Sequence, residues 1–161
     1  MAKKRVYLEP SAVSYLTAKT PRDVIKRAKH LLTRDWWERR GQWELLVSRF
    51  VLDEIADGDP RAAAKRLEAV RGLAVLPEHA LAEKLARDLA ARVPIPEKTK
   101  ADAAHIALAA FHGMDYLVTW NQKHLDNVAS RGKMRLIITN HGFRPAEIVT
   151  PERLLEDRQD G

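Results

Sequence analysis

The sequence predicts an α/β protein: a three-layer α/β/α sandwich built around a central, mainly parallel sheet. Short apolar runs typical of strands alternate with longer segments of helical periodicity, and one or two helices separate successive strands. Parallel neighbours need such long crossovers, whereas antiparallel neighbours can be joined by a tight turn. The 161 residues fit one domain. We expect that domain at residues 1–156, followed by a polar tail at 157–161.

Five apolar or aromatic runs bounded by turn residues predict the strands. They cover residues 5–8, 45–48, 73–76, 116–120 and 147–149. Glu9 precedes Pro10, and a residue before proline is kept out of the helical region, so Glu9 is expected at the end of the first strand.

Capping residues, prolines at first helical positions and apolar spacing predict the helices. Thr20 and Pro21 are expected to open a long helix to about Arg39, and Asp59 and Pro60 to open another. The long helix is expected to bury Val24, Ala28, Leu31, Leu32 and Trp36 and to expose Arg22, Lys26, Arg27, Lys29, Arg34, Arg39 and Arg40. Further helices are predicted at 12–16 (capped by Ser11), 50–56, 77–92, 101–112 (closed by Gly113), 121–130, 134–141 and after Thr150, with a loop at 93–96.

The composition excludes several chemistries. The chain has no cysteine, so disulfides, thiolate nucleophiles, iron–sulfur clusters and thiolate zinc sites are absent. The dinucleotide, P-loop, hydrolase and zincin motifs are also missing. No apolar stretch has the length of a membrane span or a signal peptide, which favours a cytoplasmic protein. The net charge of +6 is compatible with a polyanionic partner such as RNA, although many basic proteins bind none.

Four polar side chains are expected at the carboxyl edge of the sheet, where ligands bind in such folds. Glu9 ends the first strand, Glu54 lies in the helix after the second, Asp102 opens the most apolar helix, and Asn121 follows the fourth strand. Clustered carboxylates repel one another until a cation neutralises them, and oxygen ligands suit Mg²⁺ or Mn²⁺. A hard cation there would orient a phosphodiester and activate water.

Each of these positions also has a purely structural explanation. Glu9 fits a solvated strand end, Glu54 an exposed helix position beside another acid, and Asn121 a helix cap. Asp102 fits a capping box with Thr99, although an acid heading so apolar a helix needs a reason. His105, one turn later, could orient a carboxylate or contact a phosphate, but a histidine on such a helix is more often a hydrogen-bonded core residue. Trp36 and Trp37 suit packing better than base stacking.

The ordered set of segments resembles the PIN domain family, and specifically the VapC-like toxins of toxin–antitoxin pairs. The resemblance rests on VYLEPSAVSYL at 6–16, VSRFVLDE at 47–54, ADAAHIA at 101–107 and DYLVTWN at 115–121. It implies that Glu9, Glu54 and Asp102 hold Mg²⁺ or Mn²⁺, with Asn121 assisting, and that Ser11 supports the first acid. Position 9 is Glu where the family usually has Asp, and position 121 is Asn where many members have Asp, so the number of metals stays open.

The resemblance further implies an endoribonuclease that leaves 5′-phosphate and 3′-hydroxyl ends, a cognate antitoxin and a homodimer. One alternative is a PIN-like module whose altered acids no longer catalyse and which binds RNA or regulates. Another is a receiver-like phosphoacceptor, although the sequence lacks the paired N-terminal acids and the late lysine of that class.

Overall fold

The computed structural model of the protein describes residues 2–93 and 100–157. Five parallel strands form one sheet in the order β3-β2-β1-β4-β5, which confirms the predicted fold class. The strands are β1 (Lys4–Leu8), β2 (Trp43–Ser48), β3 (Ala74–Leu76), β4 (Tyr116–Val118) and β5 (Glu147–Val149). A receiver-like protein has the order 2-1-3-4-5, so that interpretation is wrong.

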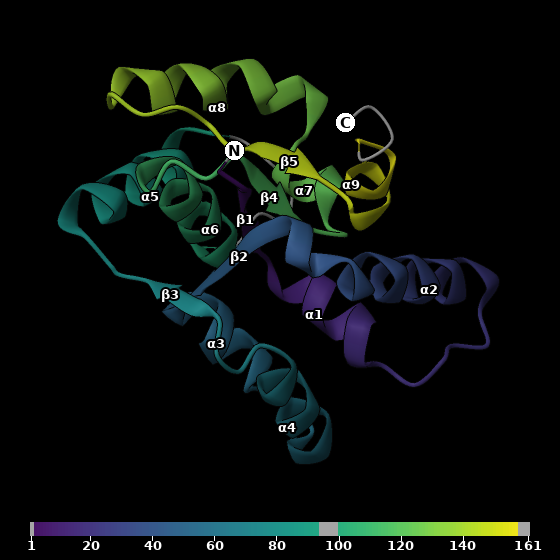
Figure 1. Ribbon diagram of the computed structural model, residues 1–161. Helices are drawn as coiled ribbons and strands as arrows, with labels where there is room; N and C mark the ends of the chain where they lie inside the picture. The colour runs from purple at the N-terminus through teal and green to yellow at the C-terminus, as the bar shows by residue number, and fades with distance from the viewer. Residues whose placement is uncertain (1, 94–99, 158–161) are drawn as a thin grey trace.

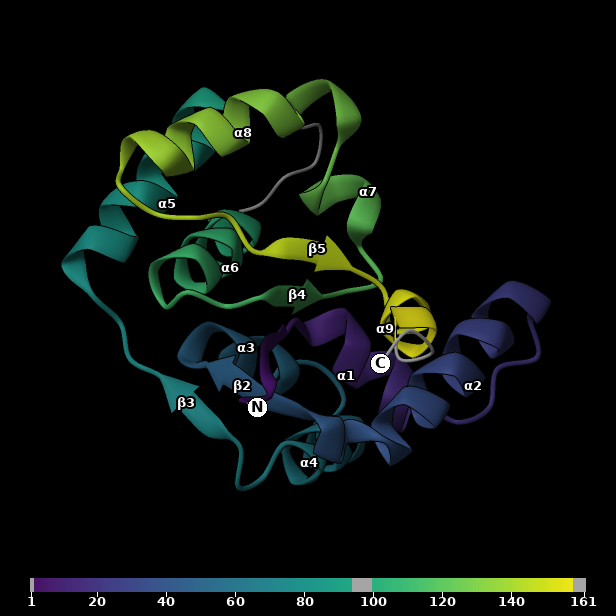
Figure 2. The same cartoon turned by 45° about the horizontal axis from the view of Figure 1, so that its top comes forward.

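Helices cover both faces of the sheet. Figures 1 and 2 show α5 and α6 on one face, with α1 and α2 on the other. The helices of the described residues are α1 (Pro10–Thr17), α2 (Val24–Glu38), α3 (Arg49–Ile55), α4 (Pro60–Ala69), α5 (Ala80–Arg92), α6 (Lys100–Phe111), α7 (Gln122–Leu125), α8 (Val128–Asn140) and α9 (Pro151–Asp157), with a 3-10 turn, η1, at Arg40–Gln42. None of them is both long and apolar enough to span a membrane.

The core forms where the central strands meet α6. The side chains of Val6, Tyr7 and Leu8 on β1 are all buried, as expected for a strand covered on both faces. All eight residues from Ala103 to Ala110 are also buried. A helix that is apolar all round lies inside a protein, so its one buried histidine, His105, has to find polar partners there.

Two predicted helix starts are wrong. Ser11 does not cap the first helix: Glu9 does, and its side chain accepts a hydrogen bond from the Ser11 backbone amide. The long helix begins at Val24 with Asp23 as its N-cap, so Thr20 and Pro21 precede it. In both cases a carboxylate accepts the amide hydrogens at the helix start, and such a group also favours the helix dipole. The Asp59 cap before Pro60 is confirmed.

The predicted buried face of α2 is largely wrong. Val24 is 81% exposed and Leu31 is 52% exposed, whereas His30, Thr33 and Trp36 are buried. Ala28 is exposed and Leu32 half-buried.

Trp36 packs against Trp37 and Trp43 with ring centroids 6.1 Å apart in each pair, which supports packing over base stacking. The basic side chains of this helix are exposed as expected, except for the half-buried Lys29.

Smaller differences concern element boundaries. The fourth strand stops at Val118, and α5 begins at Ala80 with His79 as its cap. Helices α7 and α8 are separated at Asp126 and Asn127, not near residue 132, because Asn127 caps the second helix. Part of the predicted loop at 93–96, the residue Thr99 and the tail positions 158–161 lie outside the described residues.

Candidate active site

The candidate site lies at the carboxyl ends of β1 and β4. These neighbours form the switch point of the sheet, since the chain continues from β1 towards β2 and from β4 towards β5. Ligands of open α/β sheets bind in the crevice at such a point. Leu8 pairs with Val118 in the register, so the residues that follow both strands emerge side by side.

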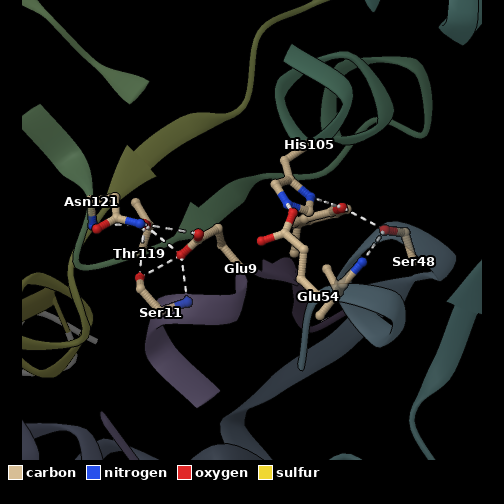
Figure 3. Close-up of polar contacts among 9 residues, drawn as sticks. Glu9, Ser11, Ser48, Glu54, His105, Thr119 and Asn121 are labelled. Atoms are coloured by element: carbon tan, nitrogen blue, oxygen red, sulfur yellow. Dashed lines mark hydrogen bonds and ion pairs between the residues drawn. The ribbon is translucent and has the colours of Figure 1, made fainter. Parts of the chain in front are cut away.

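Glu9 is buried at this edge, with only 2% of its surface exposed. Its Oε2 atom accepts hydrogen bonds from the Ser11 amide at 2.9 Å, from the Ser11 hydroxyl, and from the Thr119 hydroxyl at 2.8 Å. Among the described residues, its Oε1 atom has one long contact, with Asn121 Nδ2 at 3.4 Å. No lysine or arginine of the described residues forms an ion pair with it. One oxygen of Glu9 is therefore fixed by donors and the other is nearly uncommitted (Figure 3).

The two hydroxyls around Glu9 are themselves held by the backbone after β4. Ser11 Oγ accepts from the Trp120 amide at 2.8 Å, and Thr119 Oγ1 accepts from the Asn121 amide at 2.8 Å. Each hydroxyl thus receives a backbone hydrogen bond and donates its own proton to the same carboxylate oxygen. This arrangement offsets the cost of burying an acid.

Glu54 reaches the site from α3, on the β2 side. Its side chain is 38% exposed, and its Oε1 atom lies 2.7 Å from His105 Nε2. The other ring nitrogen, His105 Nδ1, lies 2.6 Å from the Tyr7 hydroxyl, which in turn lies 2.6 Å from Ser48 Oγ. Ser48 also caps α3 by accepting from the Val51 amide at 3.3 Å. Figure 3 shows the second oxygen of Glu54 pointing toward Glu9.

The electrostatics of Tyr7 connect the two acids. Burial raises the pKa of the Tyr7 phenol far above its ordinary value, and the negative charges of Glu9 and Glu54 raise it further, against the Ser48 hydrogen bond. Both carboxylates therefore lie close enough to Tyr7 to act on it. The phenol stays protonated at neutral pH and retains its proton to donate.

The structure does not gather all the predicted ligands into one cage. Asp102 lies in the first turn of α6, one turn before His105, and is half-buried. Within residues 2–93 and 100–157, no three or more His, Cys, Asp or Glu side chains form a group that could hold a metal ion. The structure brings Glu9 and Asn121 into direct contact at 3.4 Å and links Glu54 to Tyr7 through His105, but no hydrogen bond or ion pair of the described residues joins Glu9 to Glu54.

Sequence reasoning missed Tyr7, Ser48 and Thr119. Tyr7 and Thr119 lie inside predicted strands, where the mainly apolar pattern indicated core packing. Ser48 was visible only as the last residue of a predicted strand. One signal was available in the sequence: all three hydroxyl residues lie within a few positions of a candidate acid or of a predicted helix start. A hydroxyl in such a place often forms a hydrogen bond with a polar neighbour.

The donor chemistry fits Mg²⁺ or Mn²⁺. Glu54 has one oxygen held by His105 and the other pointing toward Glu9, whereas the less constrained oxygen of Glu9 faces Asn121. Mg²⁺ usually keeps several waters and binds one or two carboxylates together with substrate phosphates, rather than a closed protein cage. Two carboxylates, an amide and no sulfur ligand match that requirement.

Comparisons with known proteins support the fold. A scan of protein-family models and a search of curated proteins found no match. Among solved structures, the chain is similar to Mycobacterium tuberculosis VapC20, described as a sarcin-ricin loop cleaving toxin. The TM-score is 0.58 and the identity 18%, and the alignment covers 74% of this chain and 92% of that one. The protein therefore has a PIN/VapC-like fold.

Proposed function

We propose that the protein is a metal-dependent endoribonuclease that hydrolyses RNA phosphodiesters. The observation that carries the proposal is the placement of Glu9 and Glu54 at the switch point of a PIN-like sheet, each with one oxygen left for a ligand. Glu9 is buried with no basic partner among the described residues, and the exposed Glu54 points an oxygen toward it, so a cation between the two acids would neutralise like charges.

Glu9 Oε1 and Glu54 Oε2 would hold Mg²⁺ or Mn²⁺, with Asp102 as a third ligand and Asn121 assisting directly or through water. When bound, the cation supplies positive charge for the phosphate oxygens and lowers the pKa of water. Ser11 and Thr119 fix the orientation of Glu9. The net charge of +6 and the exposed basic side chains of α2 supply contacts for the RNA backbone.

We further propose that the protein is the toxin of a toxin–antitoxin pair, acts in the cytoplasm, forms a homodimer and is held inactive by a cognate antitoxin. The support is the fold shared with VapC20, a toxin by its description. The alternative of a catalytically impaired RNA-binding module rests only on the Glu at position 9 and the Asn at position 121. The uncommitted oxygens of Glu9 and Glu54 favour a working site.

The test is cleavage of a structured RNA by the purified protein, with Mg²⁺, with Mn²⁺ and with excess EDTA. We expect cleavage only with a divalent cation, and we expect Glu54→Gln and Asp102→Asn to abolish it. Asp53→Asn is the matched control, because Asp53 is an exposed acid next to Glu54 on the same helix. Its activity should equal that of the wild type.

Cleavage that persists in EDTA, or in both variants, would contradict the proposed chemistry. Absence of cleavage together with tight RNA binding would favour the impaired module. The toxin role has a separate test, the neighbourhood of the gene. A small open reading frame for an antitoxin next to the gene would favour the toxin role, and its absence would favour a solitary nuclease.

A further inference from the structure

We propose that His105 is a positioning residue for Glu54, held in place by Tyr7 and Ser48; this inference rests on the proposed function of the site. His105 is completely buried, yet both of its ring nitrogens have hydrogen-bond partners on other elements. The chain of contacts starts at the beginning of α3 and returns to α3 at Glu54 (Figure 3).

The donors along this chain can be assigned from chemistry. An ionised Glu54 only accepts hydrogen bonds, so His105 Nε2 carries a proton and donates it to Oε1. In the neutral imidazole, Nδ1 is then the acceptor, and the Tyr7 hydroxyl donates to it. Ser48 donates to the Tyr7 oxygen and accepts from the Val51 amide. In this series of hydrogen bonds, every donor has an acceptor, and the protons are all donated in the direction from Ser48 to Glu54.

The consequence for Glu54 is a fixed orientation. A glutamate whose side chain is 38% exposed on a helix would otherwise sample several rotamers. The His105 contact at 2.7 Å holds Oε1 on the inner side, and the other oxygen then points toward Glu9. Groups that orient ligands in this way lower the cost of assembling a metal site.

A purely structural role for these hydrogen bonds makes a different prediction. In that case Ser48, Tyr7 and His105 only provide hydrogen-bond partners for buried groups. Removing one of them would then lower the stability of the fold without a specific effect on metal affinity. A matched control exists in His30. It is also a buried histidine, 1% exposed, with Nδ1 2.7 Å from the Tyr15 carbonyl oxygen.

The experiment measures Mn²⁺ affinity by electron paramagnetic resonance, together with urea unfolding, for the full-length wild type and for His105→Gln, Tyr7→Phe and His30→Gln. We expect His105→Gln and Tyr7→Phe to weaken Mn²⁺ binding by about 10–100-fold, the range typical for residues that orient metal ligands. Tyr7→Phe keeps the ring, so it tests the proposal even if His105→Gln unfolds. His30→Gln should lose stability and bind Mn²⁺ as the wild type does.

Kinetics with limiting Mn²⁺ give a second readout. We expect kcat to fall by about tenfold or more in His105→Gln while KM for RNA changes by less than about threefold, because most of the proposed phosphate contacts lie on the basic surface of α2 and not at Glu54.

Wild-type Mn²⁺ affinity in both His105→Gln and Tyr7→Phe would overturn the inference, and so would an equally weakened affinity in His30→Gln or a wild type that binds no Mn²⁺. If the positioning role is right but the proposed ribonuclease function is wrong, the result is different. The wild type would then bind Mn²⁺ and the two variants would bind it more weakly, but none of the three proteins would cleave RNA.

Discussion

The Thr119 hydroxyl lies 2.8 Å from Glu9 Oε2, although 110 residues separate the two in the sequence. The contact exists because β1 and β4 are neighbours and each residue directly follows its strand. Thr119 is completely buried and also accepts from the Asn121 amide, so one hydroxyl ties the carboxylate to the turn after β4.

Thr119→Val is expected to destabilise the protein by about 1–3 kcal/mol, because it leaves a buried carboxylate and a backbone amide each short of a partner. Urea denaturation measures the change. Thr17→Val is the control: the Thr17 hydroxyl donates to the Val13 carbonyl within the same helix, α1, and little effect is expected. Equal stability of Thr119→Val and the wild type would contradict the role assigned to Thr119.

The contact between Asp88 and His141 predicts how stability depends on pH. His141 Nε2 lies 2.9 Å from Asp88 Oδ2 and joins α8 to α5. The His141 hydrogen bond, assisted by Arg92, lowers the pKa of Asp88 below its ordinary value of 3.8. A lowered pKa in the folded state gives stability that is present above pH 3.8 and disappears as the pH falls through the folded-state value.

Asp88→Asn should therefore be less stable than the wild type at pH 7, and the difference should shrink in acid. Urea denaturation between pH 7 and pH 2 measures it. Asp35→Asn, which breaks an exposed ion pair with Arg39, should change stability little at any pH. A difference for Asp88→Asn that grows in acid would contradict the assignment.

Trp36 offers a test of core packing. It is fully buried, and its Nε1 atom has no hydrogen-bond partner in the part of the chain that the structure describes. Trp36→Ala should cost about 3–5 kcal/mol of stability, the usual range for removing a buried aromatic side chain. Trp36→Phe also removes the unpaired N–H group, whose burial is unfavourable, so it should cost less than about 1.5 kcal/mol. Thermal and urea unfolding compare the two; equal destabilisation would contradict this reasoning.

The basic surface of α2 should contribute to RNA affinity by binding phosphates. Lys26, Arg27 and Arg34 are exposed there. Removing one side chain that binds a phosphate should make the slope of log K against log salt concentration shallower by about 0.7 for single-stranded RNA. Binding without divalent cations compares Arg34→Gln with Lys133→Gln, an exposed lysine on α8. Identical salt slopes for Arg34→Gln and the wild type would indicate that this face is only solvated.

The fold could be predicted from local chemistry for most of the chain. Alternating strand and helix patterns required a parallel sheet, and the Asp59 cap before Pro60 located α4. The buried side of α2 was not predictable, because this helix packs on α1 and α9, and its apolar residues Val24 and Leu31 lie outside that contact. Helix periodicity shows which residues share a face but not which face a distant segment covers.

The candidate site was predicted in part. Glu9, Glu54 and Asn121 were chosen for their places at the ends of strands and the starts of helices, and that placement depends on local pattern. The partners that orient them were not predictable, since the Tyr7 to His105 contact joins β1 to α6 across 98 residues. Only the three-dimensional structure shows that His105, for which a structural role was the main interpretation, contacts a candidate ligand.

The most direct test is the position of Mn²⁺ in crystals soaked with that ion, located by its anomalous scattering. We predict one peak in contact with both Glu9 Oε1 and Glu54 Oε2 in the wild type, and no peak there in Glu54→Gln. A wild-type map with no peak between these two carboxylates, or with Mn²⁺ bound only elsewhere, would contradict the proposal that Glu9, after β1, and Glu54, on α3, share a cation.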